Sequence, residues 1–206
     1  LDLFKNCSFE DLNYSINNGN KYRVNSHLIG NLDFEKELIN TSQKVSLNKD
    51  SEDVIFEKKE ILLGNNLDLH NKNIIVKNDV KICLENSAIL RIKDSKISNI
   101  GNKKISFFGC GNNPGSVMIS NSNINLYEIE INGLSSPKKQ LRMLYGGLNI
   151  INSNLKAKKL FTNSSRSEDG VNFINSNIEI DQIKSSNILS DAVDSDSSNL
   201  EIGQIF

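Results

Sequence analysis

From about residue 54 onward, the chain consists of short runs in which hydrophobic and polar residues alternate, separated by Asn, Ser and Gly. Three runs share the tetrapeptide Asn-Ser-Asn-Ile or Asn-Ser-Asn-Leu, at 121–124, 152–155 and 175–178, and a fourth carries Ser-Ser-Asn-Leu at 197–200. The copies lie 31, 23 and 22 residues apart. Alternation is typical of strands with one buried face, and a recurring interval of this length indicates a repeat architecture.

The alignment of the four copies extends well beyond the tetrapeptide. Five mainly hydrophobic columns recur: Val117, Leu148, Val171 and Val193; Ile119, Ile150, Phe173 and Ser195; Ile124, Leu155, Ile178 and Leu200; Leu126, Ala157, Ile180 and Ile202; and Ile129, Leu160, Ile183 and Ile205. A single coil cannot bury such a face, so the coils must stack about 4.8 Å apart. The pattern therefore predicts an all-β fold, a right-handed parallel β-helix with coils of about 22 residues.

The repeat also explains why the chain contains 32 Asn residues, since Asn is a turn-forming residue. Asn tolerates the left-handed backbone conformation that a tight bend needs, and its amide can bond the equivalent amide one coil away. We therefore expect an asparagine ladder at the bends, with a parallel stack of serines beside it. The ladder comprises Asn123, Asn154, Asn177 and Asn199, and the serines are Ser122, Ser153, Ser176 and Ser198.

Weaker copies of the pattern continue upstream, so we predict a β-helix domain over residues 51–206. Six further strand candidates are Val54–Phe56, Ile61–Leu63, Leu67–Leu69, Ile74–Val76, Val80–Leu84 and Ala88–Ile92. Residues 1–50 differ: the sequence from Ser8 to Asp11 is a helix-start signal, and Phe9, Leu12 and Ile16 would share one helical face. We expect a short helix there, in a region that caps the exposed first coil. The insertion Gly133–Tyr145 should form an external loop.

The Asn-Ser-Asn-Ile coils, with Asp169-Gly170-Val171 and Asp191-Ala192-Val193-Asp194 before two of them, resemble the repeats of right-handed parallel β-helix proteins of the pectate-lyase-like superfold. The resemblance lies at the level of the fold. It implies one of several functions: polysaccharide lyases, hydrolases and epimerases, phage tailspikes, adhesins, and β-helix domains attached to other catalytic domains all share this architecture. It also implies an extracellular or cell-surface location.

The strongest candidate site is acidic. Asp169 and Asp191 share a column one coil apart, and Asp194 and Asp196 follow. In polysaccharide-cleaving β-helices such outer carboxylates act as general acid and base or bind calcium. The catalytic candidates are thus Asp169, Asp191 and Asp194, and the metal candidates are Asp191, Asp194 and Asp196.

Two features weigh on this candidate site in opposite directions. The alternation places Asp194 in an outward column with Met118, Asn149 and Asn172, where a substrate groove would lie. The competing interpretation is that these Asp residues only form turns, because Asp-Gly is a common turn dipeptide.

Charge and composition argue against several classes of binding partner and ligand. The formal net charge of −1 offers no cationic field for nucleic acid, and no apolar run is long enough to span a membrane. Cys7, Cys83 and Cys110 form an odd set without metal-ligand spacing, so buried free thiols are the favoured interpretation. His27 and His70 are isolated, which argues against a zinc site.

Two functions remain. The favoured hypothesis is a non-catalytic β-helix scaffold or binding segment of a bacterial surface or secreted protein. Such a segment would contact a polysaccharide or another surface protein, and further coils of the same chain would follow it. The alternative is a polysaccharide lyase or hydrolase domain that uses the acidic site. A lyase needs a basic residue, but Arg142 and Arg166 lie in loops and neither aligns with the acidic column.

Overall fold

The computed structural model describes residues 13–16, 20–23, 52–57, 59–137 and 144–206. The chain divides into two compact units, Leu1–Asn40 and Thr41–Phe206. In the first unit, β1 (Asn13–Ile16) and β2 (Asn20–Arg23) form an antiparallel pair.

The predicted N-terminal helix is therefore wrong at residues 13–16, and its remainder lies outside the described residues. Asn and Tyr have low helix propensity, and the two strands pair instead, with Tyr14 in register with Tyr22. The capping role expected for residues 1–50 stays a prediction.

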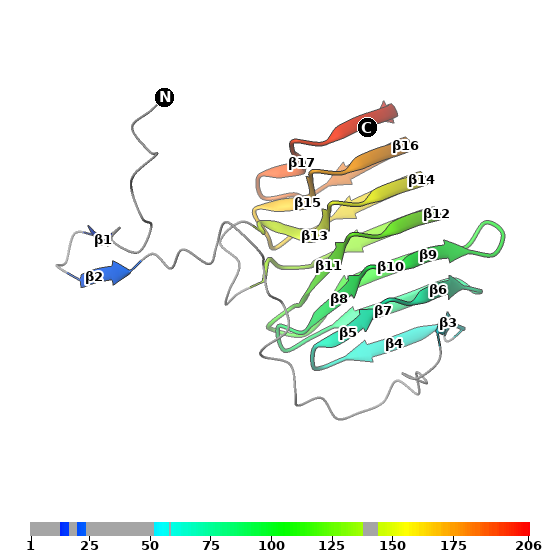
Figure 1. The fold of residues 1–206 in the computed structure, drawn as a ribbon, viewed down its shortest axis with the longest axis horizontal. Coiled ribbons are helices and arrows are strands. Elements are labelled where there is room, and N and C mark those ends of the chain that lie inside the picture. The colour runs from blue at the N-terminus through cyan, green and yellow to red at the C-terminus, as the bar shows by residue number, and fades with distance from the viewer. Residues whose placement is uncertain (1–12, 17–19, 24–51, 58, 138–143) are drawn as a thin grey trace. The chain divides into compact units, whose positions relative to one another are not determined.

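The second unit is a parallel β-helix, as predicted (Figure 1). The six-stranded sheet takes one strand from each coil: β5 (Leu67–His70), β8 (Ile89–Lys93), β11 (Ser116–Ser120), β13 (Gly146–Ile151), β15 (Asp169–Ile174) and β17 (Asp191–Asp196). The ten-stranded sheet contains β3 (Asp53–Phe56), β4 (Glu60–Leu63), β6 (Asn73–Val76), β7 (Val80–Leu84), β9 (Lys96–Asn99), β10 (Lys104–Gly109), β12 (Asn123–Asn132), β14 (Asn154–Asn163), β16 (Asn177–Ser186) and β18 (Asn199–Ile205). All six upstream strand candidates are confirmed.

The later coils are simpler than the early ones because two strands merge into one. Strand β12 pairs through its first residues with β9 and through its last residues with β10. From β12 onward, a single strand of 10 residues covers both segments in β12, β14 and β16. This regularity explains why the sequence repeat is clearest after residue 116.

The interior consists of the predicted columns, which the strand pairing reproduces residue for residue. Leu160, Val171 and Phe173 are fully buried, and the hydrophobic core runs from Val54 to Ile183. Each fully buried aliphatic or aromatic side chain contributes about 1.5–3 kcal/mol. The stacked apolar columns therefore hold the coils together.

In the Asn-Ser-Asn turns, the left-handed backbone conformation and the ladder belong to two different Asn residues, whereas the prediction assigned both to the second. The left-handed residues are the first Asn of each motif, Asn121 (φ 49°), Asn152 (φ 48°) and Asn175 (φ 47°), not the second. The second Asn begins the next strand, where its extended backbone lets its amide reach the equivalent amide. The predicted ladder is confirmed: Nδ2 donates to Oδ1 at 2.9, 3.0 and 2.9 Å along Asn154→Asn123, Asn177→Asn154 and Asn199→Asn177.

The serine stack is also confirmed, and Ser122, Ser153 and Ser176 are buried while Ser198 is half-buried. The hydroxyl of Ser153 donates to the Ile151 carbonyl at 2.7 Å and accepts from the Ser122 amide N–H at 3.0 Å. Ser122 and Ser176 repeat both bonds in their own coils. Each hydroxyl thus satisfies one backbone group of its own coil and one of the neighbouring coil.

The insertion after β12 is not wholly external, contrary to the expectation for Gly133–Tyr145. Leu134 is fully buried in the core and Ser135 is buried as well. The Leu134 carbonyl accepts from the Arg166 N–H at 2.8 Å, which ties this segment to the next coil. Residues 138–143 of the insertion lie outside the described residues. The apolar character of Leu134 was the signal that this end of the insertion faces inward.

Candidate functional site

The acidic residues selected from the sequence gather on the six-stranded sheet, where β15 meets β17. Asp169 is in register with Asp191, and Asn172 is in register with Asp194. Adjacent strands lie about 4.8 Å apart, so the predicted stacking of the two Asp residues is confirmed. Asp196 follows two residues after Asp194 on β17. The strands therefore bring all four carboxylates to a single junction between coils.

Burial separates these carboxylates into two kinds. Asp169 is only 3% exposed, whereas Asp191 and Asp196 are exposed. Burial, followed by the negative charge of Asp194, raises the pKa of Asp169 to about 6, and Glu168, Asp191 and Asp196 act in the same direction. Asp169 is thus the acidic group of the site that can hold a proton near neutral pH.

The residues expected to line a substrate groove beside Asp194 are buried. Met118, Asn149 and Asn172 are 3%, 0% and 0% exposed, so this column is closed rather than open to a substrate. Alternation along a strand gives the face of the sheet on which a residue lies, but it does not say whether that face is covered. The expectation of an open groove at this column was therefore wrong.

Within this closed column, the two Asn residues differ in their hydrogen bonds. The Asn149 Oδ1 accepts from the Gly146 N–H at 3.2 Å, and its Nδ2 donates to the Gly146 carbonyl at 2.7 Å. One coil later, neither Oδ1 nor Nδ2 of the fully buried Asn172 has a partner. An unpaired buried amide costs about 1–3 kcal/mol. The buried Asn172 side chain on β15 therefore lacks the hydrogen bonds that its counterpart Asn149 makes on β13.

Other expectations for the site have mixed outcomes. Among the described residues, no three His, Cys, Asp or Glu side chains are arranged to hold a metal, and the calcium site at Asp191, Asp194 and Asp196 stays a prediction. His70 has one acidic neighbour, because its Nε2 lies 2.8 Å from the Asp94 Oδ2. Arg166 is exposed in the segment before β15; Arg142 and His27 lie outside the described residues.

A second candidate surface, which the sequence analysis did not identify, lies on the outer side of the ten-stranded sheet. A shallow groove of about 590 Å³ follows the stack along β9, β12, β14, β16 and β18. The polar side chains that line it are Lys96, Asn123, Asn125, Asn154, Lys156, Asn177, Glu179, Asn199 and Glu201. These residues form two parallel columns, one made of Lys96 and the asparagine ladder and the other made of the residues two positions further along the later strands. The signal was present in the Asn-x-(polar) pattern that follows each Asn-Ser turn.

Ion pairs between coils hold the charged side chains of this outer face. Lys156 pairs with Glu179, and Lys158 pairs with Asp181 at 2.7 Å, as the column alignment predicts. The hydrogen bond to Asp181 raises the pKa of Lys158. Lys156 and Glu179 line the groove, whereas Lys158 does not. The chain therefore contains a matched pair of lysines, one inside the groove and one outside it.

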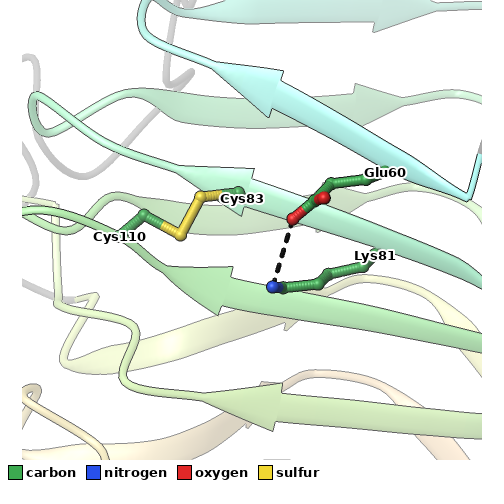
Figure 2. Close-up of a disulfide and its surroundings, with 4 residues drawn as sticks. All are labelled: Glu60, Lys81, Cys83 and Cys110. Carbon is green, nitrogen blue, oxygen red and sulfur yellow. Dashed lines mark ion pairs between the residues drawn. A yellow bond between two sulfur atoms is a disulfide. The ribbon is translucent and has the colours of Figure 1, made fainter.

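Cys83 and Cys110 form a disulfide between neighbouring coils, which corrects the expectation of free thiols. Their Cα atoms lie 5.7 Å apart although 27 residues separate them in sequence. Figure 2 shows the disulfide between β7 and the neighbouring coil, with the Lys81–Glu60 ion pair (Nζ to Oε1, 3.2 Å) drawn beside it; Cys83 is buried. The odd count showed only that the three cysteines of this sequence cannot all pair with one another, and the stacking of the coils brings Cys83 and Cys110 together. Cys7 lies outside the described residues.

Fold and site together define a parallel β-helix repeat protein with an amide-lined groove and an acidic coil junction. No protein family, no curated protein and no solved structure matches the chain. In the described part of the chain, no helix has the length and apolar character needed to cross a membrane.

Proposed function

We propose that this chain is a non-catalytic β-helix scaffold or binding segment of a bacterial surface or secreted protein, which contacts polysaccharide through the groove on its ten-stranded sheet. The observation that carries the proposal is the groove itself. It runs across five strands, and its lining combines regularly stacked amide and charged residues with the apolar residues between them, Ile97, Ile124, Leu155, Ile178 and Leu200.

The chemistry of the groove suits a hydroxyl-rich chain. A side-chain amide has two N–H donors and two acceptor lone pairs, and the ladder bond between Asn154 and Asn123 occupies one donor of the first and one acceptor of the second. The remaining donors and acceptors recur once per coil, about every 4.8 Å. A sugar hydroxyl both donates and accepts, so a linear polysaccharide that lies along the stack can meet each rung in turn.

The disulfide supports the proposed location. Disulfides persist in oxidising compartments such as the cell exterior and the bacterial periplasm, and they are rare in the cytosol. The Cys83–Cys110 bond is therefore expected in a protein that acts outside the cytoplasm. Mass spectrometry of the protein isolated from its native host under alkylating conditions tests this. Free thiols at both positions would contradict the location.

The matched lysines test the groove. Titration with a panel of neutral and acidic polysaccharides, followed by calorimetry, should give binding that Lys156→Ala weakens severalfold. Lys158→Ala removes an equivalent ion pair outside the groove and should leave binding unchanged. Equal effects of the two variants, or no binding by any polysaccharide, would contradict the proposal.

One observation favours the enzyme alternative. Asp169 and Asp191 are adjacent carboxyl groups, and the raised pKa of Asp169, about 6, lets it act as an acid beside the second carboxylate. Glycoside hydrolysis uses such a pair. Cleavage of an acidic polysaccharide that Asp169→Asn abolishes and Asp181→Asn does not would establish this function. Calcium titration of the protein and of Asp191→Ala and Asp194→Ala would show whether the predicted cation takes part.

A further inference from the structure

The groove on the ten-stranded sheet changes its charge from one end to the other. The charged side chains that line it are Lys96 on β9, Lys156 on β14, Glu179 on β16 and Glu201 on β18. Both lysines thus lie on the earlier strands and both glutamates on the later ones. Because neighbouring strands are about 4.8 Å apart, the two ends of this series are roughly 19 Å apart.

The β9 end of the groove has hydrogen-bond donors without partners. Every bond of the asparagine ladder runs from the Nδ2 of a later coil to the Oδ1 of the coil before it. The ladder starts at Asn123, because the residue in register before it is Lys96, which cannot accept a hydrogen bond. The Oδ1 of Asn123 therefore accepts from Asn154, whereas its Nδ2 donates to no residue in the described part of the chain.

The charge of Lys96 is available to a ligand. This side chain is exposed and forms no ion pair with any residue that the structure describes. Its neighbours in register on both sides, Asn73 and Asn123, are uncharged. The acidic residue nearest to it in sequence, Asp94, is bonded to His70 instead. Lys96 and the Asn123 amide therefore offer N–H groups that an anion can accept from.

The β18 end of the groove has the opposite character. Glu179 and Glu201 are in register on adjacent strands, and Lys156 pairs with Glu179. Glu201 is exposed and has no ion pair within the described residues. One cation thus serves two carboxylates, which leaves a negative charge at this end. A carboxylate only accepts hydrogen bonds, so the matching ligand group is a donor with a positive charge.

We propose that the groove binds a zwitterionic glycan, whose carboxylate lies at Lys96 and Asn123 and whose free amino group lies at Glu201. This inference rests on the proposed function, because it names the class of polysaccharide that the same groove takes. The hydroxyl groups between the two charges meet the amide rungs of the ladder. A chain bound in the reverse direction would place like charges together at both ends, so the groove also sets the direction of the bound glycan.

Titration calorimetry of the intact protein with three oligosaccharides long enough to span the groove tests the ligand class. Oligogalacturonate carries only carboxylates, a chitosan oligosaccharide carries only amines, and an N-deacetylated hyaluronan oligosaccharide carries both. At about pH 5.5 both kinds of group are charged. The third oligosaccharide should bind about threefold to tenfold more tightly than either of the others, and added salt should reduce this advantage.

Two exposed positions separate the ends of the groove, and each variant is the control for the other. Lys96→Ala should weaken the binding of oligogalacturonate about threefold and leave the chitosan oligosaccharide unaffected. Glu201→Gln should do the reverse, and both should weaken the zwitterionic ligand. Equal effects of each variant on all three ligands, or equal affinity for the zwitterionic ligand and neutral dextran, would overturn this inference while the proposed function stands. Failure of every polysaccharide to bind would overturn both.

Discussion

In the turns between the two sheets, equivalent side chains bond one another from coil to coil, whereas at the β15–β17 junction equivalent side chains repel. Asn123, Asn154 and Asn177 form an unbroken ladder of amides. Asp169 stacks on Asp191 in the same way, but each carboxylate only accepts hydrogen bonds. A stack of like residues therefore satisfies itself only when each side chain contains both a donor and an acceptor.

A substitution in the buried part of the turn should cause the largest loss of stability. Ser153→Ala removes the hydroxyl that accepts from the Ser122 N–H and leaves that buried donor without a partner. We expect the free energy of unfolding to fall by about 2 kcal/mol. Urea denaturation measures it. Ser186→Ala, which removes an exposed hydroxyl, should change it by a few tenths of a kcal/mol; similar losses in both variants would show that the serine stack adds nothing special.

Substitutions at the left-handed position of the turn should cause the second-largest loss of stability. Asn152 has a φ of 48°, so Asn152→Ala places in the left-handed region a residue that adopts it less readily than Asn or Gly does. The expected loss is about 1 kcal/mol, part of which reflects the lost amide bond from Asn175. Asn152→Gly loses the same amide bond but fits the backbone, so thermal unfolding should show it to be the more stable variant. The reverse order would contradict the role assigned to the first Asn.

A substitution in the exposed asparagine ladder should cause the smallest loss of stability. It can also convert an amide of the ladder into a carboxylate like those at the β15–β17 junction. Asn154→Asp replaces an amide that donates to Asn123 with a carboxylate that cannot donate at neutral pH. Because the ladder is exposed, we expect a loss of about 0.5–1 kcal/mol at pH 7. Protonation restores a donor, so the loss should shrink below about pH 4. Chemical denaturation at both pH values measures this, and a pH-independent loss would argue against the donor requirement.

Much of the fold was predictable because each column of the repeat gives independent evidence for the same register. The alignment of Val117 with Leu148 and of Ile124 with Leu155 already placed the strands side by side, and the structure pairs them in that register. The predicted ladder and serine stack followed from the same alignment. The N-terminal segment has no repeat, so only local propensity was available, and the helix expected there was wrong at Asn13–Ile16.

The candidate site was predictable only in part, because burial and hydrogen bonding depend on contacts between coils. The sequence placed Asp169 above Asp191, but nothing in it indicated that one is buried and the other exposed. The column of Met118 and Asn149 was expected to be open and is closed. The groove on the ten-stranded sheet was missed because its walls come from strands in five successive coils.

By itself, the sequence determined the parallel β-helix, the period of its coils and the residues that stack, because alternation and repeat length act through local geometry that every coil shares. Only the tertiary structure decided which of the stacked residues are satisfied. It paired Cys83 with Cys110, bonded Asn149 to Gly146, and left Asn172 unpartnered beside the acidic residues of β17. Hydrogen bonds, disulfides and pKa values depend on distances of a few ångströms between coils, and a column alignment does not contain those distances.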